Sequence, residues 1–478
     1  MIGCRFSVIL KGTEWGLMEG RYEGGNMNRD HVLVDIKKPP PGPNARKWAE
    51  FHRRYAARST YYEGFIWDRS KPAIGPFCTD VDGNVILDFV SHVASSGLGY
   101  NHPELVSMAS RLQSVDPDRY AGCDFIGAWG EDPEKSEVPT PSHLHYKLME
   151  ITSQFGFGSA FFSNSGAEAV ENAIKICYDH KKNYGYGVCF YGAFHGRTLG
   201  ALSLNRSKKT QRDWFPQIPN IIDFPYCTCQ NHPCRCGWMV CCTGKEGMRS
   251  RLDHFLDPDI GLVDPEEVAF IIIEPIQGEG GYNVPSLEFM KEVSRLAKEH
   301  SIPLISDEIQ AGMGRTGKWW AIEHFGIKPD IITVAKPLRV GATLGRTELF
   351  PQQEYRISST WGEGNALSSA IGYTIIEIIQ KENLLDNATR MGNYFLEQLK
   401  GLQGEYPFIH DVRGIGLMDA MEMDSRERRD RLIRKAFEKG LLLLGCGYKV
   451  IRFLPPLDVR KREIDMALEV LEGVCKEV

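Results

Sequence analysis

The chain has 478 residues, and its 56 Lys and Arg against 62 Asp and Glu give a formal net charge of −6. A mildly acidic chain has no general attraction for nucleic acid or anionic membranes, so neither is an expected partner. Apolar residues make up 42% and charged residues 25%, which is typical of a soluble globular protein. The length predicts two or three domains.

The sequence also argues against secretion and membrane insertion. No run approaches the roughly 18 consecutive apolar residues of a membrane span, and the first residues lack the apolar core and cleavage site of a signal peptide. We expect residues 1–28 to form a flexible extension. The 13 cysteines are not evenly spaced as in a secreted disulfide scaffold. These features predict a cytoplasmic protein.

The predicted elements, in chain order, give an α/β fold. Residues 29–90 begin with a proline-rich arm and contain a hairpin-turn signal at Asp80–Asn84, so we assign them to an arm and part of a small domain. In residues 91–350 apolar strands alternate with helices, which predicts a large domain with a mostly parallel central sheet. Its predicted strands are Ser159–Ser163, Gly187–Tyr191, Val268–Ile273, Ile302–Ser306 and Ile331–Ala335, and its predicted helices are Ala167–Lys182 and Ser286–His300.

Residues 351–478 are predicted to form a C-terminal small domain of α+β type. The predicted elements are helices at Ala366–Lys381 and Asn387–Leu402, strands near Leu441–Leu444 and Val450–Leu454, and a helix from about Lys461.

Polar residues follow several of the buried strands. Glu274 comes after Val268–Ile273, Asp307 ends the next predicted strand, and Lys336 follows the one after that. Sites in open α/β sheets form where strands end, and a lysine there can be desolvated into a nucleophile. The plainer interpretation of Lys336 is a surface lysine. Ser165-Gly166-Ala167 lies between a strand and a helix, where backbone N–H groups can bind a phosphate.

These positions belong to a series of motifs through which the chain resembles class III (ω-type) pyridoxal-phosphate aminotransferases of fold type I. The resemblance covers Pro72 to about Leu457 and is strongest toward 4-aminobutyrate and lysine 6-aminotransferases. Its motifs are Gly99-Tyr100-Asn101-His102-Pro103, Asn164-Ser165-Gly166-Ala167-Glu168-Ala169, Phe194-His195-Gly196-Arg197, Glu274–Gly281, Asp307-Glu308-Ile309-Gln310, Ala335-Lys336, Ser359-Thr360-Trp361-Gly362 and Ile451-Arg452-Phe453.

The resemblance implies that pyridoxal 5′-phosphate is the cofactor. Lys336 would hold it through a Schiff base and later move the substrate proton, and Asp307 would pair with the pyridinium nitrogen. Gln310 would bind the ring 3′ oxygen, and Glu274 occupies the family position that helps orient this group. Phe194 would stack on the ring.

The resemblance also implies how the phosphate is bound. Ser165, Gly166 and Ala167 would hold it within one subunit, and Thr360 would reach it from the neighbouring subunit. We therefore expect a homodimer with active sites at its interface.

Three further residues are expected to bind substrate. Arg197 and Arg452 resemble the two carboxylate-binding arginines of the family, since a guanidinium grips a carboxylate through two hydrogen bonds. Glu279 resembles the switch residue that neutralises Arg452 when an ω-amino donor binds and swings away for a dicarboxylic acceptor.

A cysteine-rich insertion at 227–242 falls outside the family pattern. Its dense thiols suit zinc or an iron–sulfur cluster, whereas unpaired thiols or disulfides explain them equally well. The candidate metal ligands are Cys227, Cys229, Cys234, Cys236, Cys241 and Cys242.

We therefore expect an aminotransferase that moves the terminal amino group of 4-aminobutyrate, lysine or ornithine to 2-oxoglutarate. The first alternative is an amino-acid racemase or epimerase of the same fold, which needs the same lysine and aspartate but no acceptor. The second is a cofactor-fold protein kept for binding, which the presence of Lys336, Asp307 and the phosphate loop disfavours.

Overall fold

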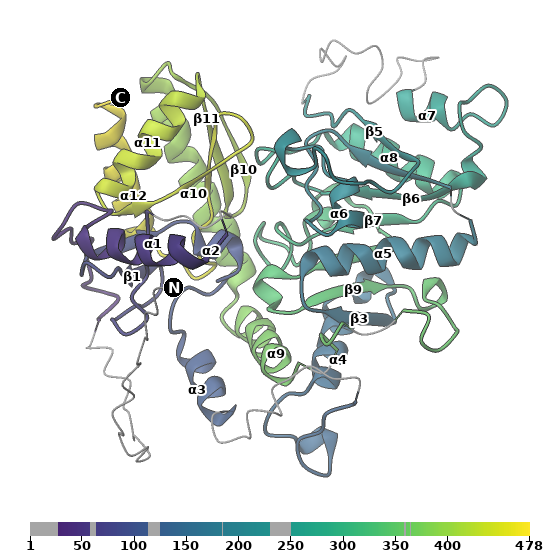
Figure 1. Ribbon diagram of the computed structural model, residues 1–478, viewed down its shortest axis with the longest axis horizontal. Helices are drawn as coiled ribbons and strands as arrows, with labels where there is room; N and C mark the ends of the chain where they lie inside the picture. The colour runs from purple at the N-terminus through teal and green to yellow at the C-terminus, as the bar shows by residue number, and fades with distance from the viewer. Residues whose placement is uncertain are drawn as a thin grey trace, which may run out of the picture.

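The computed structural model describes residues 27–57, 64–112, 125–183, 185–229, 250–357, 360–363 and 365–478. They form a large and a small domain that lie side by side (Figure 1). Of the expected N-terminal extension, residues 1–26 lie outside the described ranges. None of the described helices is long and apolar enough to cross a membrane.

The large domain is built on a seven-stranded sheet in the order β3-β9-β8-β7-β6-β4-β5. The neighbours from β8 to β5 pair in parallel, whereas β9 is antiparallel to both β3 and β8. The prediction of a mostly parallel sheet is confirmed. The strands are β3 (Ser159–Ser163), β4 (Tyr186–Phe190), β5 (Ile221–Phe224), β6 (Val268–Ile273), β7 (Leu304–Asp307), β8 (Ile331–Val334) and β9 (Gly341–Gly345).

This sheet is buried on both faces, as the continuous apolar run of β6 predicts. The neighbouring residues Ile271 and Ile272 of β6 point into two different core clusters. Helix α8 (Leu287–Glu299) packs into the first cluster and α5 (Gly166–Lys181) into the second, where it crosses the front of the sheet in Figure 1. With both faces covered, the polar residues that follow the strands gather at the edge where the parallel strands end.

The small domain contains a four-stranded antiparallel sheet in the order β10-β11-β14-β13. Its strands are β10 (Ile409–Ile415), β11 (Met418–Met423), β13 (Leu444–Cys446) and β14 (Val450–Phe453), and its helices are α10 (Leu384–Glu405), α11 (Arg426–Glu438) and α12 (Lys461–Cys475). Helix α9 (Ala366–Lys381) precedes α10 and lies between the two domains in Figure 1.

A third sheet joins residues from both ends of the chain. Strands β1 (Phe77–Thr79) and β2 (Val85–Asp88) form a hairpin at the predicted turn, where Gly83 has φ +85°. Strand β2 also pairs in parallel with β12 (Leu441–Leu442). The residues before the large domain therefore pack with the C-terminal domain.

The remaining helices are α1 (Pro43–Tyr55), α2 (Ser91–Ala94), α3 (Pro103–Leu112), α4 (Pro141–Ile151), α6 (Leu199–Ser203) and α7 (Arg251–Phe255). Two predictions about strands need correction. The single strand expected at Leu441–Leu444 is divided between β12 and β13, which join different sheets. Strands β5, β9, β10 and β11 were not predicted, and β9 consists largely of small residues that give little strand signal.

Candidate active site

A cavity of about 480 Å³ opens where β6, β7 and β8 end. Glu274 follows β6, Asp307 is the last residue of β7, and Lys336 lies two residues after β8. Most of the predicted site residues line this one cavity: Ser165, Gly166, Ala167, Phe194, Arg197, Glu274, Glu279, Asp307, Gln310 and Lys336.

The start of α5 forms one wall of the cavity. Ser165 is the N-cap, and its hydroxyl accepts a hydrogen bond from the Glu168 backbone N–H at 3.2 Å. Gly166 and Ala167 follow in the first turn, where free N–H groups and the helix dipole favour an anion. The geometry therefore suits a phosphate group at this wall.

Thr360 lies next to this wall within the same chain. Its hydroxyl donates to Glu168 Oε2 at 3.1 Å, and its backbone carbonyl accepts a hydrogen bond from the Asn164 side chain. The contact with a cofactor bound by a neighbouring subunit therefore stays a prediction for this residue.

Asp307 is buried and is held by a histidine that sequence reasoning did not single out. His195 Nδ1 lies 2.7 Å from Asp307 Oδ2, and the backbone N–H of Ile309 donates to Asp307 Oδ1 at 3.1 Å. The other ring nitrogen of His195, Nε2, is buried without a hydrogen-bond partner. The signal for His195 was its place beside Phe194 in the Phe-His-Gly-Arg motif.

Glu274 organises the backbone around the cavity. Its two carboxylate oxygens accept hydrogen bonds from the backbone N–H groups of Phe194 and Gly278, each at 2.8 Å. Burial raises the pKa of Glu274 to about 7. These bonds fix the segments that carry Phe194 and Glu279.

Lys336 opens a short 3₁₀ turn after β8. Burial, with a contribution from the charge of Arg452, lowers the pKa of its amine to about 8. The lysine is thus desolvated at the cavity, as a nucleophilic or proton-transferring amine requires. The alternative of an ordinary surface lysine does not describe this environment.

The predicted switch pair is present as an ion pair. Arg452 Nη1 on β14 donates to Glu279 Oε2 at 3.2 Å, and Arg452 is only 6% exposed. Glu279 lines the cavity, whereas Arg452 is not among its described lining residues and reaches it through this ion pair. Lys208 binds the other Glu279 oxygen, so this carboxylate lies between two cations. Lys208 was not predicted as a site residue.

The metal prediction for the cysteine-rich insertion is tested only in part. Cys227 is buried and Cys229 is partly buried, whereas Cys234, Cys236, Cys241 and Cys242 lie outside the described residues. Within the described ranges, no group of three or more His, Cys, Asp or Glu side chains could hold a metal ion.

Comparison with known proteins identifies the family. Residues 65–475 match the model of the family Aminotransferase class-III, and the chain belongs to this family. It is 32% identical to a Bacillus subtilis protein named as a probable 4-aminobutyrate aminotransferase, over 82% of this chain and 89% of that protein. It is 33% identical to the alanine/serine racemase of Pyrococcus horikoshii, over 93% of this chain and 94% of the racemase.

Solved structures agree in fold. The lysine aminotransferase of Mycobacterium tuberculosis superposes with a TM-score of 0.73 at 28% identity, covering 90% of this chain and 98% of that one. The protein is therefore an enzyme, a pyridoxal-phosphate-dependent transaminase of class III with the corresponding α/β fold.

The residues of the cavity fit this cofactor. Lys336 offers a desolvated amine, Asp307 a buried carboxylate for the ring nitrogen, and the start of α5 a cradle for the phosphate. Gln310 lines the cavity with its Oε1 buried and unpartnered, which leaves that atom available to a polar ligand.

Proposed function

We propose that this enzyme transfers the terminal amino group of an ω-amino acid to 2-oxoglutarate, with 4-aminobutyrate, lysine or ornithine as the donor. The observation that carries the proposal is the Glu279–Arg452 ion pair at the cavity wall. A pocket that must accept both a terminal amine and a dicarboxylic acid needs a cation that can be neutralised and released.

The physical argument concerns buried charge. The carbon beside a terminal amine carries no carboxylate, so a free Arg452 would be left buried and unpaired when such a donor binds. Glu279 removes that cost by pairing with it. A dicarboxylic acceptor brings its own carboxylate, which can replace Glu279 on the guanidinium. Lys208, already bound to Glu279, offers the displaced carboxylate a cationic partner.

The remaining site residues have roles that follow from their positions. When bound, pyridoxal phosphate supplies an electron-withdrawing ring that stabilises negative charge on the substrate carbon beside the amine. Asp307, oriented by His195, would hold a proton at the ring nitrogen. With a pKa near 8, the Lys336 amine can take a proton from the substrate carbon and return it.

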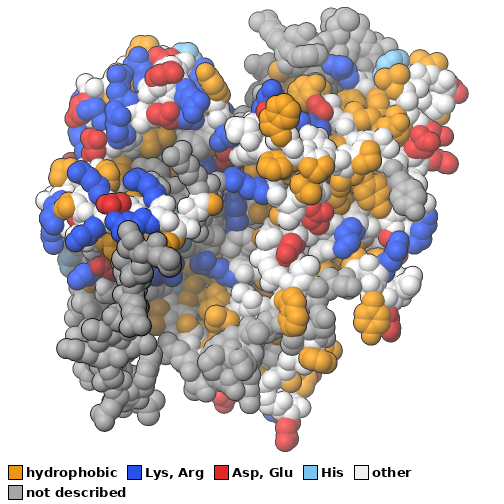
Figure 2. Space-filling view, viewed as in Figure 1, with side chains coloured by type: hydrophobic (Ala, Val, Ile, Leu, Met, Phe, Trp, Pro, Cys, Tyr) orange, Lys and Arg blue, Asp and Glu red, His pale blue; other side chains and the backbone are white. Residues whose placement is uncertain are grey.

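We further propose that the enzyme is a cytoplasmic homodimer with active sites at the subunit interface. Large apolar side chains are exposed on the large domain, including Trp214, Phe125 and Ile126, and Figure 2 shows hydrophobic side chains gathered on one face of that domain. Such surface is usually covered in an assembly. Light scattering should give twice the chain mass of 53.9 kDa, and a monomer with full activity would refute this part.

A racemase is the second candidate, because a relative that aligns with 93% of the chain is named alanine/serine racemase. Racemisation uses a lysine and a ring-bound aspartate but converts an amino acid into its enantiomer without an oxo-acid acceptor, so it has no need for a carboxylate switch. The Glu279–Arg452 pair therefore favours transamination.

The test is a single turnover of the holoenzyme without any oxo acid. The amines are 4-aminobutyrate, L-lysine, L-ornithine, L-alanine and L-leucine, and the cofactor absorbance is followed together with the released product. We expect one ω-amine to convert the cofactor stoichiometrically and 2-oxoglutarate to restore it with formation of glutamate. If no amine converts the cofactor, while alanine exchanges its α-hydrogen in D₂O and racemises, the second candidate replaces the first.

A further inference from the structure

Arg339 lines the same cavity but has no role in the chemistry described so far. It follows the 3₁₀ turn Lys336–Leu338, and its backbone N–H closes that turn on the Lys336 carbonyl at 3.2 Å. The side chain also reaches solvent, so it stands at the open side of the cavity. An arginine three residues from the central lysine is thus placed where a substrate enters.

The backbone at Arg339 adopts an unfavourable conformation for a long side chain. Its φ is +69° and its ψ −9°, the left-handed region in which glycine is the easiest residue to place. Non-glycine residues held in this region concentrate at functional sites, where the side chain is needed despite the strain. Because glycine would fit this backbone better, the fold itself does not favour arginine at this position.

The charges around the cavity leave Arg339 without a counterion. The acidic residues there are already engaged: Asp307 with His195, Glu274 with two backbone N–H groups, and Glu279 with Arg452 and Lys208. Among the described residues, neither Arg339 nor Arg197 forms an ion pair. Although Arg339 reaches solvent, partial desolvation lowers the pKa of its guanidinium below the ordinary value, and no anion offsets this shift.

A chain of hydrogen bonds stands behind the guanidinium. Arg339 Nη2 lies 3.5 Å from Ser96 Oγ, which lies 3.2 Å from His92 Nδ1. The other ring nitrogen of His92 is 3.2 Å from the Tyr100 hydroxyl, and this hydroxyl donates to the buried Asp88 at 2.8 Å. This series of hydrogen bonds orients Arg339 through the neutral Ser96 hydroxyl, so the charge of the guanidinium remains available to a ligand.

We infer that Arg339 binds a carboxylate of the substrate at the open side of the cavity, in addition to the carboxylate sites at Arg197 and Arg452. The identity of the amine donor rests on the proposed function. The binding of a carboxylate by Arg339 does not depend on it. It defines the preferred donor class as amines that carry a carboxylate, over simple alkyl amines of the same length. A guanidinium–carboxylate pair of this kind is charge-assisted and can be bidentate.

The experiment compares ligands that differ only in the carboxylate. Pentanoate, which has no amine, is titrated calorimetrically into the wild-type holoenzyme and into Arg339→Gly, Arg339→Gln and Arg339→Lys. Single turnovers with 4-aminobutyrate and with 1-aminobutane are measured in parallel. We expect Arg339→Gly and Arg339→Gln to weaken pentanoate binding by about 10- to 100-fold and to slow 4-aminobutyrate similarly at low concentration. Turnover of 1-aminobutane should stay within about twofold, and Arg339→Lys should recover part of the loss.

A matched control separates strain from binding. Lys182 ends α5 with φ +52°, also in the left-handed region, and lies outside the cavity. Both Lys182→Gly and Arg339→Gly should keep or raise the melting temperature, because glycine relieves the same strain. Only Arg339→Gly should lose pentanoate.

Three results would overturn the inference: unchanged pentanoate binding, equal loss of 1-aminobutane turnover, or loss of the cofactor from Arg339→Gly on dialysis, which would place Arg339 at the phosphate instead. If no amine converts the wild-type enzyme, the proposed function fails, and the pentanoate titration still decides the role of Arg339.

Discussion

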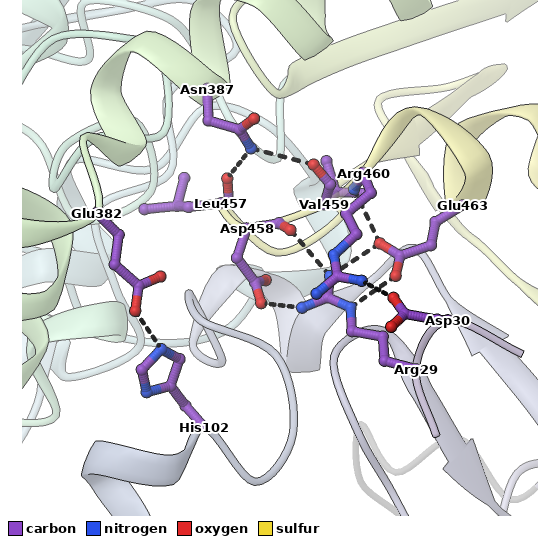
Figure 3. Close-up of polar contacts among 10 residues, drawn as sticks. All are labelled: Arg29, Asp30, His102, Glu382, Asn387, Leu457, Asp458, Val459, Arg460 and Glu463. Carbon is purple, nitrogen blue, oxygen red and sulfur yellow. Dashed lines mark hydrogen bonds and ion pairs between the residues drawn. The ribbon is translucent and has the colours of Figure 1, made fainter. Parts of the chain in front are cut away.

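Two clusters of charged residues in this molecule differ in how their cations are paired. At the cavity, Arg339 and Arg197 are exposed to solvent and have no carboxylate partner among the described residues, and Lys336 has a lowered pKa. At the junction between the N-terminal segment and the C-terminal domain, Arg29 is enclosed by two carboxylates (Figure 3). The cations of the first cluster remain available to a ligand, whereas the cation of the second is paired with carboxylates of the same chain.

The junction shows what a structural charge looks like. Arg29 Nε donates to Glu463 Oε1 at 2.6 Å, and Nη2 donates to Glu463 Oε2 and to the Asp458 carbonyl, both at 2.8 Å. Its Nη1 binds the Asp458 carboxylate. These partners raise the pKa of Arg29 despite its burial, the opposite of the shift at Arg339. The comparison teaches that a carboxylate partner distinguishes a cation that joins two segments of the fold from a cation that is left for a ligand.

The largest effect should come from removing the central lysine. Lys336→Met should reduce turnover by at least about 10³-fold, because the residue that moves the substrate proton is lost. The cofactor should then leave on dialysis. Full activity in this variant would refute the assignment of Lys336. The control is Lys208→Met, which removes the cation paired with Glu279.

The same variant has a second, pH-dependent signature in the apoprotein. The folded state holds the Lys336 proton only up to about pH 8, whereas the unfolded chain holds it to its ordinary value of 10.5. Unfolding therefore takes up a proton between these values, and wild-type stability rises with pH across this window. Below pH 8 the buried cation costs about 3 kcal/mol, so Lys336→Met should be more stable at pH 7. Urea denaturation at pH 7 and 10 should show the difference shrinking, and a constant difference would contradict the lowered pKa.

At the junction the expected signs are reversed. Arg29→Ala leaves the Asp458 and Glu463 carboxylates without their cation and should lower the free energy of unfolding by about 3 kcal/mol. Turnover per folded molecule should not change. The control is Arg54→Ala, which breaks an exposed pair with Glu50 at 2.8 Å and should have no measurable effect on stability. Urea denaturation measures the free energy of unfolding of both variants. Equal losses of stability would show that the buried pair at the junction contributes no more than an exposed one.

The sequence predicts the parts of the cavity that depend on local order. Glu274, Asp307 and Lys336 each lie at or just after the end of a buried strand. Parallel strands bring their ends to one edge of the sheet, so the meeting of these residues can be expected from the sequence alone. The start of α5 is predicted for the same reason, since a small-residue turn between strand and helix has a recognisable pattern.

The parts that were missed depend on contacts between distant segments. Arg29 meets Glu463 across 434 positions of sequence, and no local pattern marks either residue as a partner of the other. Arg339 follows Lys336 closely, but its left-handed backbone and its lack of an anion are visible only in the folded chain. His195 lay inside a recognised motif, yet its bond to Asp307 joins segments 112 residues apart.

The smallest effect is expected at Lys208, which, like Arg29, is paired with a carboxylate, here that of Glu279 at the cavity. Lys208 is 38% exposed at its side chain and shares Glu279 with Arg452. Without Lys208, Arg452 is the remaining cation paired with Glu279 among the described residues. A dicarboxylic acceptor must then displace Glu279 from Arg452 with no second cation to receive the displaced carboxylate. Partly exposed ion pairs are weak, so Lys208→Ala should raise the KM for 2-oxoglutarate by only about two- to fivefold, with the donor half-reaction unchanged. Lys209→Ala, which removes the neighbouring cation paired with Asp213, is the matched control. If Lys208→Ala instead lowers that KM, Lys208 holds Glu279 on Arg452 rather than drawing it away, and the cavity would resemble the junction more than a switch.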